Sequence, residues 1–266
     1  MRVQRIGDTS AIRDAVEVPG LGALPINAFV VHADEPVLVD TGQPAARASF
    51  MQALEEIIDP ADLRYVWLSH PDRDHMGSLF DVLDAAPRAR LVTTFLAVGY
   101  LSVEFAVPLE RVMLINPGQA LDVGAGRRLH AFRPPLFDSP MTVGFYDDAA
   151  GYVFSSDCFG APMPSIDTAY VDDLGALPKD AVREAQLLWA TADSPWVGSI
   201  DPSKFASSYE GLRRFAPDLV LSSHLPPAAG QLDTMLEMLD HAPAAAEFVG
   251  PDQAVLEAML RGVGGG

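Results

Sequence analysis

Four potential metal ligands lie within one six-residue segment, His70–His75, whose sequence is His-Pro-Asp-Arg-Asp-His. Imidazole nitrogens and carboxylate oxygens are donors with which proteins hold iron, manganese and zinc. A strand that ended at His70 would turn His70 and Asp72 to one side. Asp74, the predicted N-cap of the helix that follows, and His75 would supply a second group. One loop could then serve two adjacent metal ions; the alternative interpretation is a solvated, Asp-rich turn.

The segment stands between a predicted strand and a predicted helix, and the same alternation runs through the chain. Short apolar runs predict strands at residues 27–31, 36–39, 64–68, 89–93, 141–146, 151–155 and 218–221. Amphipathic stretches predict helices at residues 45–58, 74–85, 179–192, 203–215 and 231–241. The runs 141–146 and 151–155 are typical of a hairpin. Strands interspersed with helices favour an α/β layered fold.

Three more potential ligands stand beside predicted strands. Asp157 and His224 each follow an apolar run, and Asp138 precedes the predicted hairpin. Side chains at strand ends can converge on one edge of a sheet, so these three could complete the site. Two alternatives stay open. Asp138-Ser139-Pro140 is also an ordinary turn sequence, and a lone histidine after an apolar strand could be a hydrogen-bonded core residue.

The length and the net charge of the chain limit the classes of protein to which it can belong. A chain of 266 residues can bury a full core, and no linker divides it, so we predict one domain over residues 1–266 with a flexible tail at about 262–266. The formal net charge of -18 argues against binding to nucleic acid or to an anionic membrane surface. The N-terminus has no apolar stretch of a signal peptide and no run of 18 apolar residues occurs, which predicts a cytoplasmic protein.

The single cysteine, Cys158, excludes an internal disulfide framework and a Cys-rich zinc or iron–sulfur site within one chain. Metal ligands must therefore be histidines and carboxylates. We interpret Cys158 as a small packing residue rather than a redox group. The remaining histidines, His32, His130 and His241, are interpreted as surface or structural residues.

Together these segments resemble the metallo-β-lactamase fold. The residues that carry the resemblance are Leu38–Gly42, His70–His75, Gly144–Tyr146, Val153–Gly160 and Ser222–His224. They extend over residues from about 26 to 230. The resemblance implies an α/β fold of four layers, a metallo-β-lactamase-like αββα sandwich.

Within that superfamily the chain is more similar to the flavodiiron proteins, which reduce oxygen or nitric oxide. Most members, the zinc hydrolases, carry H-x-H-x-D-H, whereas the flavodiiron motif is H-x-E-x-D-H and this chain has Asp72 at the third position. Two features depart from that branch. Asp138 stands where the family has its middle histidine, and no flavodoxin-like domain follows His241. The resemblance therefore implies no flavin bound by this chain and a separate electron-donor protein.

The resemblance also implies roles for individual residues. Carried over position by position, the ligands of one metal ion are His70, Asp72 and Asp138, those of the other are Asp74, His75 and His224, and Asp157 bridges both. In some members the residue equivalent to His75 does not bind metal. Asp40 is expected to hydrogen-bond the backbone of the site without touching metal. Trp196, in a loop, is the candidate for a wall of the substrate pocket; plain packing is the alternative.

The implied ligand set favours iron, with zinc and manganese as alternatives. Four carboxylates would nearly neutralise two divalent ions but leave about two positive charges on two trivalent ions. We therefore expect a dinuclear non-haem iron protein that binds or reduces a small diatomic, oxygen or nitric oxide. One alternative is a dinuclear hydrolase of an ester, lactone, thioester or phosphodiester. Another is a degenerate member without enzymatic activity. A homodimer is compatible with each of them.

Overall fold

The computed structural model describes residues 1–263, and within them the strands form two mixed sheets. The first sheet contains, in spatial order, β1 (Arg2–Ile6), β2 (Thr9–Val18), β3 (Gly22–Val31), β4 (Val37–Val39), β5 (Tyr65–Trp67), β6 (Arg90–Thr93) and β7 (Val112–Leu114). The second contains β13 (Leu225–Ala229), β12 (Leu219–Ser222), β11 (Tyr152–Phe154), β10 (Gly144–Asp147), β9 (Arg128–Phe132) and β8 (Ala120–Asp122). Neighbouring strands are parallel from β4 to β7 and between β11 and β12.

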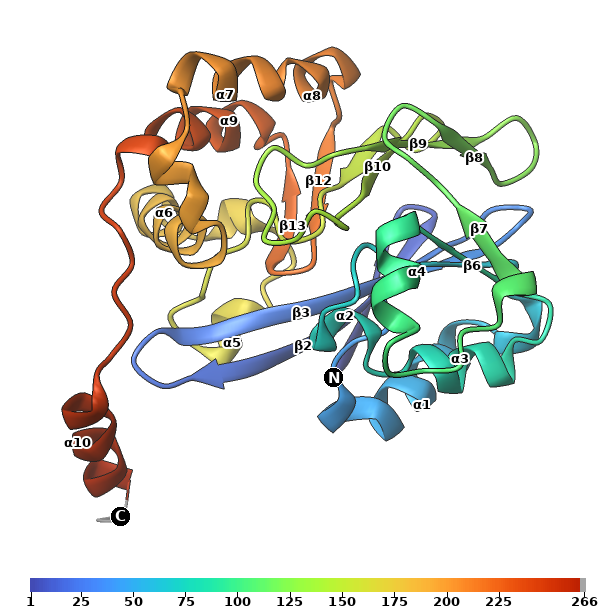
Figure 1. Cartoon of the computed structure of the whole chain (residues 1–266), viewed down its shortest axis with the longest axis horizontal. Helices are drawn as coiled ribbons and strands as arrows, with labels where there is room; N and C mark the ends of the chain where they lie inside the picture. The colour runs from blue at the N-terminus through green and yellow to red at the C-terminus, as the bar shows by residue number, and fades with distance from the viewer. Residues whose placement is uncertain (264–266) are drawn as a thin grey trace.

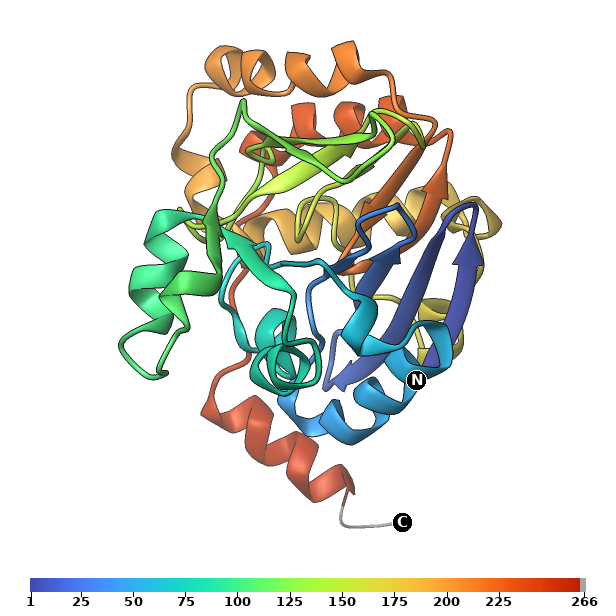
Figure 2. The same ribbon diagram turned by 90° about the vertical axis from the view of Figure 1, so that its right-hand side faces the viewer.

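Helices cover the outer faces of both sheets (Figures 1 and 2). On the first sheet these are α1 (Arg47–Ile57), α2 (Arg73–Met76), α3 (Leu79–Ala85) and α4 (Phe95–Leu101). On the side of the second sheet they are α6 (Lys179–Asp193), α7 (Pro202–Ser208), α8 (Glu210–Phe215) and α9 (Leu232–His241). The short α5 (Ile166–Ala169) packs beside β2 and β3. An extended segment leads to α10 (Gln253–Val263), so residues 262 and 263 of the predicted tail are helical and the rest of it lies outside the described residues.

Alternation along the strands produces three apolar layers. In β4, Leu38 packs with the helices of the first sheet, whereas Val39 packs against the second sheet. In β11, Val153 packs with the helices of the second sheet, whereas Phe154 packs against the first. Because successive side chains of a strand point to opposite faces, a sheet buried on both sides has apolar residues on both. The layers are therefore helix, sheet, sheet and helix.

The loops that carry the predicted ligands leave the sheets at one edge. Three of these loops follow β5, β11 and β12, and a fourth, which carries Asp138, joins β9 to β10. β4 and β5 are parallel neighbours in the first sheet, as β11 and β12 are in the second. The predicted hairpin is also present, since β10 and β11 pair antiparallel with Phe145 opposite Phe154. Within residues 1–263, no helix is long and apolar enough to cross a membrane.

Two local predictions in the His70–His75 segment are wrong. β5 ends at Trp67, because the backbone N–H of Ser69 donates to the Asp40 carboxylate and does not continue the sheet, so a loop orients His70 and Asp72. The N-cap of α2 is Asp72, and Asp74 lies in the first helical turn. The Asp72 side chain makes no capping hydrogen bond, which leaves its carboxylate available to the pocket.

The predicted helix at 74–85 is two helices, α2 and α3, separated at Gly77 and Ser78, and the one at 203–215 is divided at Tyr209. The first break has a clear cause. The backbone N–H of Gly77 donates to the carbonyl of Gly42 at 2.7 Å, and a Cβ on Gly77 would lie 2.3 Å from the carbonyl carbon of Gln43. Gly77 thus lets the α2 segment approach the loop after β4.

Gly77→Ala should lower the free energy of unfolding by about 1–3 kcal/mol or more, because the added methyl group meets backbone atoms that cannot move aside. Gly99→Ala is the matched control. Gly99 is an exposed residue of α4 whose Cβ would meet no atom within 4 Å of it, and alanine is favoured over glycine in a helix by up to about 1 kcal/mol. Urea denaturation of both variants measures the difference, and equal stability of the two would contradict the steric explanation.

Candidate metal centre

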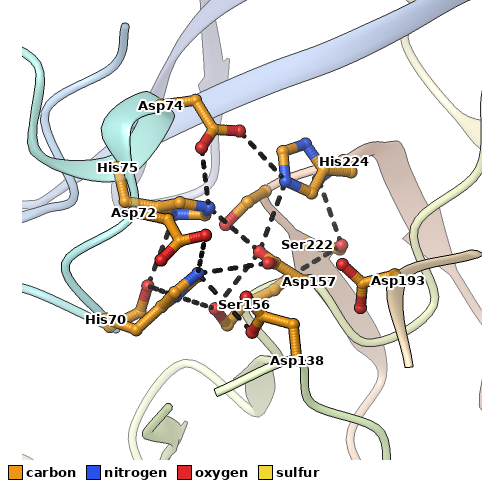
Figure 3. Close-up of polar contacts among 12 residues, drawn as sticks. His70, Asp72, Asp74, His75, Asp138, Ser156, Asp157, Asp193, Ser222 and His224 are labelled. Carbon is orange, nitrogen blue, oxygen red and sulfur yellow. Dashed lines mark hydrogen bonds and ion pairs between the residues drawn. The ribbon is translucent and has the colours of Figure 1, made fainter. Parts of the chain in front are cut away.

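The structure brings all seven predicted ligands together in one cluster (Figure 3). Three groups have donor atoms within 4.8 Å of one another: His70, His75 and Asp157; Asp74, His75 and His224; and His70, Asp72 and Asp138. The groups share members, so they form one continuous cluster. Loops from both sheets contribute to it.

Asp157 lies at the centre of the cluster. Its Oδ2 atom is 3.3 Å from Nε2 of His70, whereas its Oδ1 atom is 3.1 Å from Nε2 of His75 and 3.3 Å from Nε2 of His224. The two carboxylate oxygens therefore face different imidazoles. This is the arrangement in which one carboxylate can contact two cations.

The other carboxylates flank the two sides of Asp157. Nε2 of His70 is 3.7 Å from Oδ1 of Asp138 and 4.0 Å from Oδ2 of Asp72. On the opposite side, Asp74 places Oδ1 3.7 Å from Nε2 of His75 and Oδ2 3.4 Å from Nε2 of His224. Each half of the pocket thus has its own carboxylates besides Asp157.

Protein groups occupy the Nδ1 atom of every imidazole in the cluster. Nδ1 of His75 is 2.8 Å from Oδ2 of Asp40, and Nδ1 of His224 is 2.7 Å from the carbonyl oxygen of Pro25. These acceptors fix the tautomer with the proton on Nδ1, which leaves the lone pair of Nε2 directed at the pocket. Nδ1 of His70 lies near the hydroxyl groups of Ser69 and Ser156, at 3.2 and 3.3 Å.

The Nε2 atoms of His70 and His75 are buried and have no hydrogen-bond partner among residues 1–263. Each lies near an oxygen of Asp157, but not in the direction of a hydrogen bond. A buried nitrogen without a partner costs about 1–3 kcal/mol unless another group satisfies it. A bound cation would satisfy both.

Asp40 forms hydrogen bonds to Ser69 and His75, on the side of these residues that faces away from the other ligands. Its Oδ1 atom accepts from the backbone N–H of Ser69 at 2.8 Å, and its Oδ2 atom accepts from the Ser69 hydroxyl at 2.8 Å as well as from His75. The backbone of Asp40 is left-handed, with φ of 55°, a conformation that Asp and Asn adopt more readily than most residues. Asp40 therefore links the end of β4 to the loop after β5.

Exposure shows which side of the pocket is open. The side chains of His70, His75 and His224 are at most 2% exposed and that of Asp157 is 5% exposed. In contrast, Asp72 is 50% exposed. The side chains of Asp74 and Asp138 are 31% and 21% exposed, so these three carboxylates form the part of the cluster that solvent reaches.

Two tryptophans hold the loops that carry aspartates. Nε1 of Trp189, in α6, donates to the carbonyl oxygen of Asp157 at 3.1 Å, and its ring lies 5.0 Å from that of His224. Nε1 of Trp196 donates to the carbonyl oxygen of Phe137, the residue before Asp138, at 2.8 Å. The sequence suggested a pocket-wall or packing role for Trp196, and neither hydrogen bond was predictable from it.

Asp193, the last residue of α6, also reaches the pocket and was not singled out in the sequence. A carboxylate oxygen of Asp193 lies within 4.8 Å of oxygens of Asp138 and Asp157. No local pattern distinguishes Asp193, since it ends an amphipathic helix far from the other ligands in sequence. Cys158 is fully buried next to Asp157, and burial raises the pKa of its thiol, which agrees with a packing role.

The charges of the cluster are strongly coupled. Burial alone would raise the pKa of Asp157, but His75, His70 and His224 outweigh it and hold that pKa well below its ordinary value. Burial opposes the charged form of His224, but Asp157 and Asp74 raise its pKa to about 9. In the metal-free protein, protons on the imidazoles therefore offset part of the negative charge of the carboxylates.

A family comparison agrees with this geometry. Residues 25–182, more than half of the chain, match the sequence model of a family described as ODP family beta lactamase. The chain belongs to this family. The predicted metallo-β-lactamase relationship is thereby confirmed.

Individual relatives and solved structures show which proteins of this kind the chain is similar to. The chain is 32% identical over 154 residues to diflavin flavoprotein A 1 of Synechocystis sp., which is 58% of this chain and 26% of that protein. It is 28% identical over 134 residues to anaerobic nitric oxide reductase flavorubredoxin of Salmonella arizonae, which is 50% of this chain and 28% of that protein. Both confirm the predicted likeness to flavodiiron proteins. The chain spans about a quarter of the length of these curated relatives.

Among solved structures, rubredoxin oxygen:oxidoreductase from the anaerobe Desulfovibrio gigas superposes with a TM-score of 0.76 at 17% identity. The superposition covers 90% of this chain and 61% of that chain. It shows a common fold, and the predicted four-layer metallo-β-lactamase-like sandwich is confirmed.

Asp40→Asn should weaken metal binding by about 10–100-fold, the usual effect of losing a group that orients a ligating histidine. Asn keeps the shape and tolerates the left-handed backbone, but its amide presents a donor where Nδ1 of His75 needs an acceptor. Competition with a chromophoric chelator measures the affinity for Mn²⁺. Asp84→Asn, at an exposed position of α3, should bind as the unmodified chain does. Equal affinity of the Asp40 and Asp84 variants would contradict the role of Asp40.

Metal affinity should rise with pH between about 6 and 9. His224 has a pKa of about 9 without metal, so an ion must displace its proton, and each displaced proton makes affinity increase about tenfold per pH unit. The same raised pKa stabilises the metal-free fold at low pH, and this stabilisation is lost as pH rises through about 9. Chelator competition at several pH values tests the first trend and thermal denaturation of the metal-free protein the second. An affinity that does not vary with pH would contradict the assignment.

Proposed function

We propose that this chain is a dinuclear non-haem iron protein that binds or reduces oxygen or nitric oxide with electrons from a separate donor. One ion would lie among His70, Asp72 and Asp138, the other among Asp74, His75 and His224, with Asp157 between them. The observation that carries the proposal is the position of Asp157, whose two oxygens face the two halves of the cluster.

The residues present fit two cations. Buried Nε2 atoms of His70 and His75 lack partners within the described chain, and the fixed Nδ1 protons leave lone pairs for a metal. Four carboxylates face these nitrogens. Imidazole and carboxylate together suit iron, manganese or zinc, and no cysteine ligand is required.

Charge favours iron over zinc. The four carboxylates bring about four negative charges, which nearly neutralise two divalent ions and leave about two positive charges on two trivalent ions. A zinc hydrolase depends on a strongly Lewis-acidic ion, which His-rich ligation provides better than this set does. Iron bound here would supply reversible one-electron chemistry, which zinc lacks.

The printed names of the relatives support the choice of substrate. They include a nitric oxide reductase and an oxygen oxidoreductase, and both activities reduce a diatomic molecule. The half-exposed Asp72 marks the side from which a molecule of this size and an electron donor would approach. His70, His75 and His224 stay buried and rigidly hydrogen-bonded, so they hold the geometry of the centre while the open side admits the substrate.

Redox spectroscopy of the iron-loaded protein tests the proposal. Near-ultraviolet absorption of the ferric form should disappear on anaerobic reduction with dithionite and return when oxygen is admitted, with about two electrons per chain. Oxygen consumption with NADH should require an added reductase and carrier. The zinc-loaded protein is the control and should show no such absorption. A colourless protein that hydrolyses activated esters or lactones fully with zinc would contradict the proposal and favour the hydrolase alternative.

A further inference from the structure

Asp193 enters the pocket from a different element than the seven residues discussed above. Figure 3 shows its carboxylate directed toward Asp157. Two hydrogen bonds fix the C-terminal half of α6: Gln186 donates from Nε2 to the carbonyl of Phe159 at 3.1 Å, and Trp189 donates to the carbonyl of Asp157. The position of Asp193 is therefore set by the same loop that carries Asp157.

Three carboxylates crowd one side of the pocket. Oxygens of Asp138, Asp157 and Asp193 lie within 4.8 Å of one another. Throughout residues 1–263, none of the three forms an ion pair with a lysine or an arginine, and the ion pairs of Asp138 and Asp157 are with histidines. The Ser194 hydroxyl donates to Asp193 at 3.2 Å, but this bond carries no full charge. Like charges at such distances repel, and a cation between the carboxylates or a proton on one of them relieves this repulsion.

An independent observation points to the same space. The side chain of His70 is fully buried, and its Nε2 atom lacks a hydrogen-bond partner in the described part of the chain. This atom lies 3.7 Å from Oδ1 of Asp138 and 3.3 Å from Oδ2 of Asp157. This nitrogen forms a mixed donor set for a cation with Asp138 and Asp157, and Asp193 is the third carboxylate beside those two. A buried imidazole nitrogen without a hydrogen-bond partner among the described residues thus lies beside the clustered aspartates.

We propose that Asp193 is an additional metal-binding carboxylate, which acts on the ion held by His70 and Asp138. The proposal rests on the proposed dinuclear centre. It assigns that ion an oxygen-rich environment of Asp72, Asp138, Asp193 and the shared Asp157, with His70 as its nitrogen donor. The other ion has Asp74 and two imidazoles, so the two positions differ in character.

This asymmetry has a chemical consequence. A fifth carboxylate in the pocket reduces the charge of two trivalent ions to about one positive charge, and oxygen donors favour hard ions. The position beside Asp193 therefore selects Mn²⁺ or iron over Zn²⁺. It also stabilises the ferric state and lowers the reduction potential of that ion.

Calorimetric titration of the metal-free chain with Mn²⁺ at pH 8 tests the role of Asp193. The unmodified chain should bind two ions. The Asp193→Asn variant should bind one ion at least about tenfold more weakly and the other ion with unchanged affinity. Loss of a hydrogen-bonding partner outside the ligand set already costs about 10–100-fold in metal affinity, so loss of a ligand should cost no less. Asp180→Asn, an exposed position on the same helix, should match the unmodified chain. Iron-loaded Asp193→Asn should also show a higher reduction potential for one ion.

Thermal denaturation separates a metal role from a structural one. Because Asp193→Asn removes a charge from an anionic pocket, the metal-free variant should unfold no earlier than the unmodified metal-free chain, and Mn²⁺ should stabilise it less. Asp193→Ser provides the same comparison if the Asn variant does not fold. Two Mn²⁺ ions bound by the variant with unchanged affinities would overturn the role of Asp193 alone. Fewer than two ions bound by the unmodified chain would overturn the dinuclear centre itself.

Discussion

The structure depends on one buried carboxylate, that of Asp157, held between three imidazoles from two segments of the chain. Oδ2 faces His70, and Oδ1 faces His75 and His224. Burying an anion is unfavourable unless positive charge surrounds it, and the imidazoles supply that charge as protons when no metal is bound. Because Asp157 and His224 follow strands of the second sheet and His70 and His75 follow a strand of the first, this interaction joins the two halves of the sandwich.

Hydrogen bonds to the far sides of these residues hold the donor atoms of the cluster in place. Asp40 and the carbonyl of Pro25 accept from the Nδ1 atoms of His75 and His224, and Trp189 donates to the backbone of Asp157. Nε2 of His75, like Nε2 of His70, is buried and has no hydrogen-bond partner among residues 1–263. Protons and metal cations would compete for the same imidazole nitrogens. Metal affinity should therefore rise with pH, whereas the stability of the metal-free protein should fall.

The sequence predicted the fold class and the composition of the pocket better than the local geometry. Short continuous apolar runs predicted β4, β5 and β11, because strands buried on both faces are apolar throughout. The break at Gly77 was missed, since it depends on the approach of a loop that is distant in sequence. Asp193 was missed for the same reason: a lone aspartate at a helix end has no local signature, and only the tertiary fold places it beside Asp138.

Anomalous diffraction at the iron edge, from crystals of the iron-loaded chain, tests the central claim most directly. Two anomalous peaks should lie on opposite sides of the Asp157 carboxylate, one next to His70 and Asp138, the other next to His75 and His224. A single peak at full occupancy, or peaks away from Asp157 in crystals grown with excess iron, would contradict the dinuclear centre.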